Sequence, residues 1–269
     1  MSVIDRPRQP LLQFFRSGAL PCPYLEGRVE RKLFARLNVG NATAINAVLT
    51  EAGFRRSHDI IYRPVCPSCS ACVPVRIPTA DFQPGKSMRR ILRKNEDLSW
   101  GLVPATATVE QFELFTAYQD ARHGESDMAR MGLTDYVAMI DEGRANTELL
   151  EVRTADGQLI GVMLLDRLPD GFSAVYSFFD PDHEPRSLGN FLILCLIELA
   201  QQDGLGYIYL GYWIENSAKM AYKARFKPLE VLGPNGWYQM KGPPTPPDYG
   251  AKPDTEGDAV SVTDEDAAK

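Results

Sequence analysis

Three lysines at helical spacing are the first group in this sequence whose positions could serve chemistry. Lys219, Lys223 and Lys227 stand four residues apart, and this spacing would place them on one face of a helix. Like charges at that spacing repel each other, so a helix gains nothing locally from having all three. A negatively charged ligand would explain the group, and a solvated lysine face is the simple alternative.

The lysines belong to a longer stretch, 207–228, which we expect to fold as a strand, a short polar turn and a helix. Tyr207–Trp213 is rich in aromatic and β-branched residues, which suit a mostly buried strand. Asn216 or Ser217 can cap the helix that follows. The packed face of that helix is expected to consist of Ala218, Ala221, Tyr222 and Phe226.

A second group consists of cysteines at metal-ligand spacing. Two residues separate Cys66 from Cys69 and Cys69 from Cys72, and such turns bring both sulfurs to one side. Cys22 is the natural fourth ligand, so a zinc or iron–sulfur site is one interpretation. A knuckle of reduced, half-buried cysteines is the other. An odd number of clustered cysteines does not suit a disulfide framework, and Cys195 in an apolar segment is expected in the core.

The charge distribution is compatible with a phosphate-bearing partner despite an acidic total. The net charge is −6, but residues 241–269 hold seven acidic and three basic residues and account for −4 of it. Lys86–Lys94 carries five basic residues, and 87–98 is typical of an amphipathic helix with Met88 inside. Such a helix can bind nucleic acid through phosphates, and a purely solvated helix is the alternative.

Length and composition indicate a globular protein with real cores. The 269 residues are 44% hydrophobic and 24% charged, which is ordinary for such proteins. No apolar run approaches the roughly 20 residues that span a bilayer, and no secretory signal pattern opens the chain. We therefore expect a cytoplasmic protein without a membrane partner. We divide it into a cysteine-containing N-terminal domain (1–104), a C-terminal domain (105–241) and a disordered acidic tail (242–269).

The second half has a regular order of elements. Thr108 and Gln111 form a capping box for a helix that runs to about residue 122, and Thr134 caps a second helix. Strands are expected at 149–153, 159–167 and 172–179, followed by a buried helix at 190–202 and the strand–helix unit described above. Gcn5-related N-acetyltransferases have this order. It predicts an α/β (α+β) fold with a mixed sheet of that type in the C-terminal half, beside a smaller N-terminal cysteine-knuckle domain.

The loop before the buried helix bears on the acyl donor. In Gcn5-related enzymes a loop of the form Arg/Gln-x-x-Gly-x-Gly/Ala cradles the pyrophosphate of coenzyme A with backbone N–H groups. Here the corresponding loop reads Arg186-Ser-Leu-Gly189-Asn-Phe191, and we expect the phenylalanine to obstruct a pyrophosphate. The order of elements then indicates acyl transfer to an amine, with an aminoacyl-tRNA as activated donor. A coenzyme A-dependent N-acetyltransferase is the alternative.

Motifs in both halves carry a resemblance to a known family. They are Cys22-Pro-Tyr, Tyr62-Arg-Pro-Val-Cys66-x2-Cys69-x2-Cys72, Ser87-Met-Arg89-Arg90 with Lys94-Asn95, Tyr176-Ser-Phe-Phe-Asp180-Pro181, and Leu210-Gly-Tyr-Trp-Ile-Glu215-x3-Lys219-Met220-x-Tyr222-Lys223. Over roughly residues 20–240 they resemble the arginyl-tRNA–protein transferase family. The short length and the spaced cysteines resemble its bacterial branch, the aspartate/glutamate leucyltransferases.

The resemblance implies a reaction. Leucine would pass from Leu-tRNA to the N-terminal amine of a protein that begins with Asp or Glu, which marks that protein for N-degron proteolysis. The residues leave other interpretations open. The donor amino acid could be arginine or phenylalanine, and the protein could be a non-enzymatic adaptor that binds nucleic acid. Because the donor ester is already activated, the chemistry requires no cofactor.

Candidate site residues follow from this reaction. Glu215, between strand and helix, is predicted to hold or deprotonate the acceptor amine, and Tyr176 and Tyr212 to orient the ester or the terminal ribose. The predicted substrate-binding residues are Arg76, Arg89, Arg90, Asn190, Lys219, Tyr222 and Lys223. The arginines are candidates for the acceptor's carboxylate, which arginine can bind with two parallel hydrogen bonds. Three isolated histidines, His58, His123 and His183, are expected to be structural, and His183 lies in the loop nearest the site.

Overall fold

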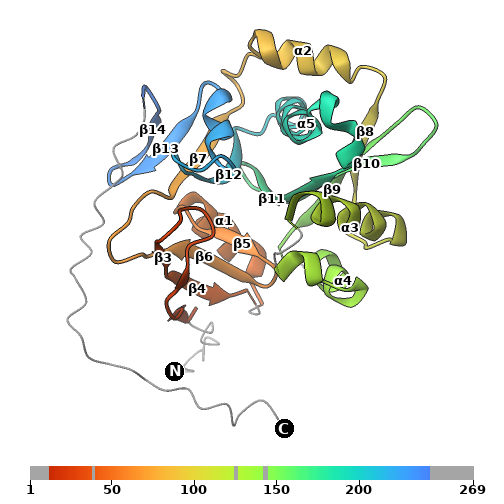
Figure 1. The fold of residues 1–269 in the computed structure, drawn as a ribbon. Coiled ribbons are helices and arrows are strands. Elements are labelled where there is room, and N and C mark those ends of the chain that lie inside the picture. The colour runs from red at the N-terminus through yellow and green to blue at the C-terminus, as the bar shows by residue number, and fades with distance from the viewer. Residues whose placement is uncertain (1–11, 38–39, 124–126, 142–144, 243–269) are drawn as a thin grey trace, which may run out of the picture.

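A computed structural model describes residues 12–37, 40–123, 127–141 and 145–242 of the chain. Within these ranges the protein has a mixed α+β fold with one eight-stranded and one four-stranded sheet (Figure 1). The mixed fold class predicted from the sequence is confirmed. None of the helices in these ranges combines the length and the apolar character needed to cross a membrane.

The eight-stranded sheet contains a single parallel pair. Its order is β14-β13-β7-β12-β11-β10-β9-β8. The strands are β14 Gly236–Gln239, β13 Glu230–Gly233, β7 Val73–Pro78, β12 Tyr207–Trp213, β11 Gly171–Phe179, β10 Leu159–Leu168, β9 Thr147–Arg153 and β8 Ser99–Pro104. Neighbours are antiparallel except β11 and β12, which are parallel. A parallel pair needs a crossover connection, and helix α5 (Leu188–Gln202) supplies it.

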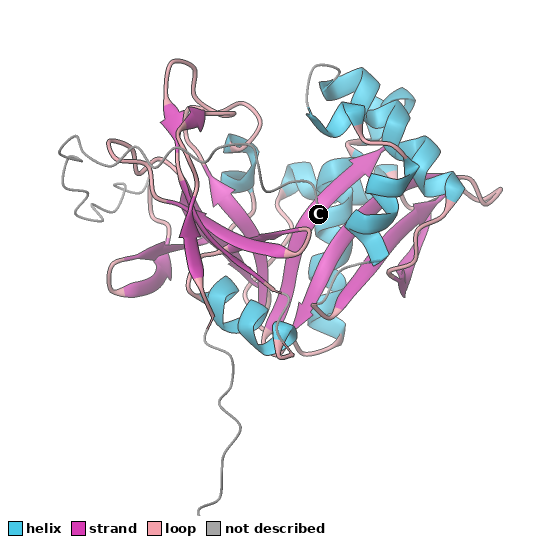
Figure 2. Ribbon diagram, turned by 90° about the horizontal axis from the view of Figure 1, so that it is seen from below, coloured by secondary structure: helices cyan, strands magenta, loops and turns pink. Residues whose placement is uncertain are grey.

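Helices cover both faces of this sheet (Figures 1 and 2). α5 and α2 (Lys86–Lys94) lie over one face, and α3 (Val109–His123) and α4 (Leu133–Asp141) over the other. Neighbouring residues of β10 separate accordingly, since Met163 packs into the core beneath α5 and Leu164 into the core beneath α3. Burial on both faces explains why β10 is apolar nearly throughout.

The four-stranded sheet forms the N-terminal part of the molecule. Its antiparallel order is β1-β4-β6-β5. The elements of this part are β1 Phe14–Arg16, β4 Lys32–Arg36, β5 Arg55–Ser57, β6 Ile60–Pro64, the helix α1 Ala42–Glu51, and the small hairpin of β2 Leu20–Pro21 with β3 Val29–Glu30. Ala35 and Ile61 are fully buried in a separate small core with residues of α1.

A buried ion pair joins the two sheets. Arg56 of β5 donates from Nε and Nη2 to the carboxylate of Asp166 in β10, at 2.6 and 2.7 Å. Asn46 of α1 and Thr147 of β9 donate to the same carboxylate at 3.0 Å each. Both charges are removed from water, with exposed fractions of 2% for Arg56 and 0% for Asp166. The hydrogen bonds satisfy the buried carboxylate and fix the N-terminal sheet on the large one.

Two strands that precede the predicted domain boundary at residue 104 belong to the large sheet. β7 lies between β12 and β13, and β8 forms an edge beside β9. Residues 73–104 therefore contribute strands to the same sheet as the predicted C-terminal domain. Of the predicted tail, residues 243–269 lie outside the described residues.

The predicted elements of the second half largely form. The capping box before α3 is confirmed, because Thr108 N donates to Gln111 Oε1 at 3.1 Å and Gln111 N donates to Thr108 Oγ1 at 3.2 Å. The three antiparallel strands, the buried helix α5 and the strand β12 are also confirmed, with ends shifted by a few residues.

The prediction of an α-helix after β12 is wrong. Residues 214–220 form turns, and Ala221–Arg225 form one short 3₁₀ helix. Lys223 is only 3% exposed and Phe226 is fully buried, so both side chains enter the interior. Tertiary packing overrides the local helical pattern, and the three lysines do not share a solvated face.

Candidate active site

The parallel strands β11 and β12 separate part-way along their length. Gly171–Ser173 pairs with Tyr207–Tyr209, and the pairing ends there. β12 turns at Gly211, whose φ is +69°. We call the separation between the remainder of the two strands, residues 174–179 and 210–213, the strand gap. Main-chain groups that face it need partners other than the neighbouring strand.

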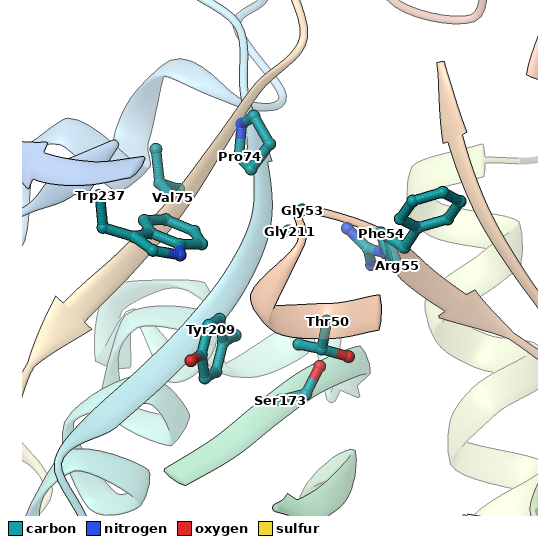
Figure 3. Close-up of a pocket in the computed structure, with 10 residues that line it drawn as sticks. All are labelled: Thr50, Gly53, Phe54, Arg55, Pro74, Val75, Ser173, Tyr209, Gly211 and Trp237. Atoms are coloured by element: carbon teal, nitrogen blue, oxygen red, sulfur yellow. The ribbon is translucent and has the colours of Figure 1, made fainter. Parts of the chain in front are cut away.

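The side chain of Arg55 in β5 reaches from the N-terminal sheet to Val175 of β11 and lies close to Gly211 of β12; Figure 3 labels Arg55 and Gly211. Its Nη2 donates to the main-chain oxygen of Val175 in β11 at 2.5 Å. On the β12 side, a Cβ added at Gly211 would stand 2.7 Å from Nη1 of Arg55. Gly211 therefore lacks a side chain for two reasons, its positive φ and the approach of the guanidinium. Arg55 thus binds β11 and lies close to β12 where their backbone pairing has ended.

Phenol groups surround this arginine. Burial works against the charged form of Arg55, but Tyr62, Tyr24, Tyr212 and Tyr222 together outweigh it, and the pKa of Arg55 is raised above its ordinary value. Among the residues that the structure describes, no carboxylate forms an ion pair with Arg55. The guanidinium is thus a half-buried cation held by a carbonyl and by aromatic neighbours.

Lys223 is a second cation at the same place. Its Nζ donates to the main-chain oxygen of Tyr212 at 2.6 Å and to Sδ of Met220 at 3.3 Å. Burial, and then the charge of Arg55, hold the pKa of Lys223 well below its ordinary value of 10.5. Within the described ranges Lys223 also has no ion pair with a carboxylate. Substrate binding by Lys223 stays a prediction. Its side chain lies in the interior near Arg55 and not on an exposed face shared with the other two lysines.

The hydroxyls of the two predicted catalytic tyrosines do different things. The Tyr212 hydroxyl lies 3.0 Å from the main-chain oxygen of Gly53 and 3.1 Å from that of Tyr62, so it holds the N-terminal sheet against β12. The Tyr176 oxygen instead accepts a hydrogen bond from Nε2 of Gln119 at 2.7 Å, which leaves its own proton for a ligand. Burial raises the pKa of Tyr176 to about 12, so this phenol stays protonated at neutral pH.

The remaining predicted residues of the C-terminal half lie at different depths. Glu215 and Lys219 are exposed in the turns after β12, and the role of Glu215 toward the acceptor amine stays a prediction. Tyr222 is half-buried next to Arg55. Asn190 is half-buried in the first turn of α5.

The arginines predicted to receive a carboxylate do not meet at the strand gap. Arg76 of β7 is already neutralised, because its Nε donates to Glu230 at 2.7 Å and its guanidinium lies 3.6 Å from the ring centre of Tyr207. Arg89 and Arg90 are exposed on α2, which packs on α5 at the face of the sheet away from the N-terminal sheet (Figure 1). Any ligand of Arg89 and Arg90 would therefore bind on the exposed surface of α2 and not at the strand gap.

The loop that resembles a pyrophosphate cradle, residues 186–191, makes contacts with other parts of the protein. Both terminal nitrogens of Arg186 donate to the carboxylate of Asp97 at 2.8 Å. A Cβ at Gly189 would stand 2.9 Å from the ring of Phe179, so close packing requires this glycine. The Phe191 side chain is buried in the core, so it does not lie across the loop as we expected from the sequence. Each part of the motif thus has a structural partner.

The cysteines gather in the N-terminal part. Burial raises the pKa of Cys72 to about 12, and Cys66, Cys22 and Cys69 add to the rise, which shows that the four thiols are neighbours. Within the described residues, however, no group of three or more His, Cys, Asp or Glu side chains is arranged to hold a metal ion. The metal site predicted from the spacing of the cysteines therefore stays a prediction, and we derive no step through it. Cys195 is buried in α5, as predicted.

A small recess lies beside the strand gap (Figure 3). Its lining consists of Thr50, Gly53, Phe54, Arg55, Pro74, Val75, Ser173, Tyr209, Gly211 and Trp237. The Thr50 hydroxyl is buried there without a hydrogen-bond partner in the described part of the chain. Buried polar atoms of this kind are commonly satisfied by an ordered water.

Sequence reasoning missed Arg55, although it lies at the centre of the site. Its one local signal is that two arginines, Arg55 and Arg56, stand together in a short strand whose neighbours are buried. Charged residues in such strands are almost always paired or functional. Only the three-dimensional structure shows that Arg56 is the paired residue and that Arg55 enters the strand gap.

Comparisons with known proteins agree with the motifs in both halves. The family profile described as "Arginine-tRNA-protein transferase, C terminus" matches residues 110–233, and the corresponding N-terminus profile matches residues 20–90. Among solved structures, a GCN5-related glucosamine N-acetyltransferase region of a fungal β-N-acetylglucosaminidase aligns with a TM-score of 0.39 and 12% identity, over 76% of this chain and 22% of that one.

Curated relatives are much closer. A protein of Paramagnetospirillum magneticum named aspartate/glutamate leucyltransferase is 52% identical over 83% of this chain and 92% of its own length. A protein of the same name from Gluconacetobacter diazotrophicus is 53% identical over 86% of this chain and 88% of its own length. Identity of this extent across both halves confirms the resemblance, and the chain belongs to the arginine-tRNA-protein transferase family, beside relatives named aspartate/glutamate leucyltransferase.

Proposed function

We propose that this transferase moves leucine from leucyl-tRNA to the N-terminal amine of proteins that begin with Asp or Glu. The observation that carries this proposal is the identity of about half of all aligned residues with relatives named for that activity, over 83–86% of this chain and 88–92% of the relatives. Two features of the structure support it. Arg55 and Lys223, which have no carboxylate partner among the described residues, stand at the strand gap, and a basic helix is exposed on the surface.

The proposed chemistry needs little covalent help from the protein. The neutral acceptor amine attacks the ester carbonyl, the C–N bond of the new peptide forms and the C–O bond to the ribose breaks. The nitrogen loses one proton, and the ribose oxygen leaves with one. An α-amine with a pKa near ~8 is neutral often enough at cell pH, so holding the two reactants in register supplies much of the rate.

Tyr176 is the group best arranged to act on the ester. Its oxygen accepts from Gln119 and its proton is free, so it can donate to the carbonyl oxygen as negative charge develops there. A donor fixed before the reaction stabilises such a charge more than water does. Glu215 is proposed to receive the proton of the amine.

The helix α2 is proposed to bind the tRNA backbone. Its exposed basic side chains are Lys86, Arg89, Arg90, Arg93 and Lys94. They form a sequence-independent positive surface suited to phosphates. Binding here would hold the body of the tRNA while its aminoacylated end reaches the strand gap from the surface.

A zinc or iron–sulfur site at Cys22, Cys66, Cys69 and Cys72 is a separate proposal, supported by their spacing and their proximity. It would stabilise the N-terminal part, because a metal bound only by the folded chain adds its binding free energy to folding. Metal analysis of protein purified without air decides it. Near one metal ion or cluster per chain supports the site, and a small fraction of that removes it. We also propose a cytoplasmic location and a role in N-degron proteolysis, as the reaction would imply.

A transfer assay tests the proposed function. Radiolabelled leucyl-tRNA and arginyl-tRNA are offered separately with peptides that begin with Asp, Glu or Ala, and acetyl-coenzyme A is run alongside. We expect transfer from leucyl-tRNA to the Asp and Glu peptides only. Transfer from arginyl-tRNA would change the donor and keep the mechanism, whereas acetylation without transfer from either tRNA would overturn the proposal.

A further inference from the structure

Arg55 and Lys223 differ from the two buried arginines of the described chain. Arg56 is paired with Asp166, and Arg76 is paired with Glu230. Arg55 and Lys223 are buried to a comparable or lesser degree at the strand gap, and within the described residues neither has a carboxylate. Moreover, they are close enough for the charge of one to lower the pKa of the other.

Such an arrangement is unfavourable for the protein alone. When Lys223 is protonated, its charge loses hydration and is repelled by the neighbouring Arg55. The nearby tyrosines offset this only through their dipoles and rings. An anion bound between the two cations would relieve both costs, so the arrangement is typical of a site prepared for a negatively charged ligand.

The donor groups that remain free fit a carboxylate. One Nη2–H of Arg55 is used on Val175 and the Nζ of Lys223 is used on Tyr212 and Met220. The guanidinium has five N–H groups, so enough remain for two parallel hydrogen bonds to one carboxylate. Since Arg55 is only half-buried, a short acidic side chain can reach it.

The surroundings favour a peptide carboxylate over a tRNA phosphate. Arg55 lies inside the strand gap among Tyr24, Tyr62 and Tyr222, whereas the basic residues suited to phosphates are exposed on α2. In addition, β11 and β12 lack each other as pairing partners beyond Ser173 and Tyr209. An extended peptide N-terminus can use such free strand edges for main-chain hydrogen bonds.

We propose that Arg55, together with the neighbouring Lys223, binds the side-chain carboxylate of an acceptor's N-terminal Asp or Glu and thereby selects acidic N-termini. This inference rests on the proposed function and adds the residues that determine its acceptor specificity. Arg56 acts as a positioning residue, because its ion pair with Asp166 holds the adjoining Arg55 in place.

The test measures peptide affinity in the absence of tRNA, by fluorescence anisotropy of labelled peptides that differ only in an N-terminal Asp or Asn. We expect the wild-type chain to bind the Asp peptide at least ~30-fold more tightly, as is typical of a buried, hydrogen-bonded charge pair. Arg55→Gln should remove this preference, Arg55→Lys should retain part of it, and Lys223→Met should reduce it. Arg36→Gln, which changes an exposed arginine of the same small sheet, is the matched control and should leave the preference unchanged.

The outcomes separate the alternatives. If Arg55→Gln stays folded by circular dichroism and retains the wild-type Asp/Asn ratio, the inference is wrong. A loss of leucyl-tRNA affinity in that variant, without a change in the ratio, would also overturn it and assign Arg55 to a phosphate. If Arg55→Gln does not fold, Arg55→Lys and Lys223→Met provide the same comparison. If the wild type binds acidic peptides selectively but transfers no leucine, this inference stands and the proposed function is wrong. If leucine transfer and its preference for acidic peptides do not depend on Arg55, the proposed function stands and this inference is wrong.

Discussion

Arg56 and Asp166 form a fully buried, two-point ion pair at 2.6 and 2.7 Å between residues 110 positions apart in the chain. We expect Asp166→Asn to lower the free energy of unfolding by about 3–5 kcal/mol, because it leaves the Arg56 charge buried without its counter-charge. Urea unfolding followed by circular dichroism measures this. The matched control is Asp59→Asn in the exposed pair Arg36–Asp59, which should change stability by less than about 1 kcal/mol. Similar small losses in both variants would contradict the assigned role of the buried pair.

Tyr176→Phe tests the hydrogen bond to the ester. The change removes the free hydroxyl proton and retains the ring, so we expect kcat for leucyl transfer to fall about 100-fold, as when one fixed donor to a developing oxyanion is removed. Peptide affinity should be unchanged. Steady-state kinetics with saturating leucyl-tRNA give both values, and Tyr238→Phe, at an exposed position, is the control. Normal kcat in Tyr176→Phe would exclude this hydroxyl from the chemistry.

Glu215→Gln tests the proton acceptor. If Glu215 takes the proton of the acceptor amine, kcat should fall by roughly 100-fold, the lower end of general-base contributions. The affinity for tRNA should remain as in the wild type, since Glu215 lies in the turn after β12 and not on α2. Filter binding and transfer kinetics check the two parts. Unchanged turnover would remove Glu215 from the mechanism and leave the amine to lose its proton to water.

The double variant Arg89→Ala with Arg90→Ala tests the surface of α2. Each lost phosphate contact should reduce the slope of log affinity against log salt by about 1, so leucyl-tRNA should bind more weakly and with less salt dependence. The measurement is a salt titration of tRNA affinity. Arg36→Ala serves as an exposed control away from α2. Wild-type affinity and slope in the double variant would make α2 a solvated surface.

The buried Lys223 predicts a pH dependence of stability. Its pKa is lowered on folding, so the unfolded chain binds the proton more tightly and the charged lysine destabilises the fold at low pH. This cost disappears as the pH rises from the folded pKa toward the ordinary value of 10.5. We therefore expect Lys223→Met to raise stability relative to wild type most at the low end of that window, with a benefit that shrinks as the pH rises. Urea unfolding of both chains at pH values from about 6 to 10 decides the question, and a benefit independent of pH would show that Lys223 is not the titrating group.

The sequence alone was sufficient for elements with a strong local signal. The capping box at Thr108 and Gln111, the apolar helix α5 and the strand β12 all form, because neighbouring residues determine caps, periodicity and burial. The prediction of a helix after β12 was wrong because distant contacts decide that segment. There the side chains of Lys223 and Phe226 are drawn into the interior, and contacts distant in sequence decide the backbone.

The candidate site was predicted only in part for the same reason. Tyr176, Tyr222 and Lys223 do gather at the strand gap. Arg55, however, comes from more than 100 residues earlier in the chain, and no local pattern connects it to β11. Arg76 was predicted to bind the acceptor's carboxylate, but it is paired with Glu230, which lies 154 residues later in the chain.

The place of β7 has a consequence for how the protein must be made. β7 is translated early, yet both of its neighbours in the sheet, β12 and β13, begin more than 120 residues later. A nascent chain therefore holds an apolar strand, Val73–Pro78, without partners until most of the sequence has left the ribosome. Such non-local pairing folds slowly and exposes the strand to aggregation. The two stretches that the family profiles match separately thus both contribute strands to one sheet, and the strand gap forms only when β5, β11 and β12 are all in place.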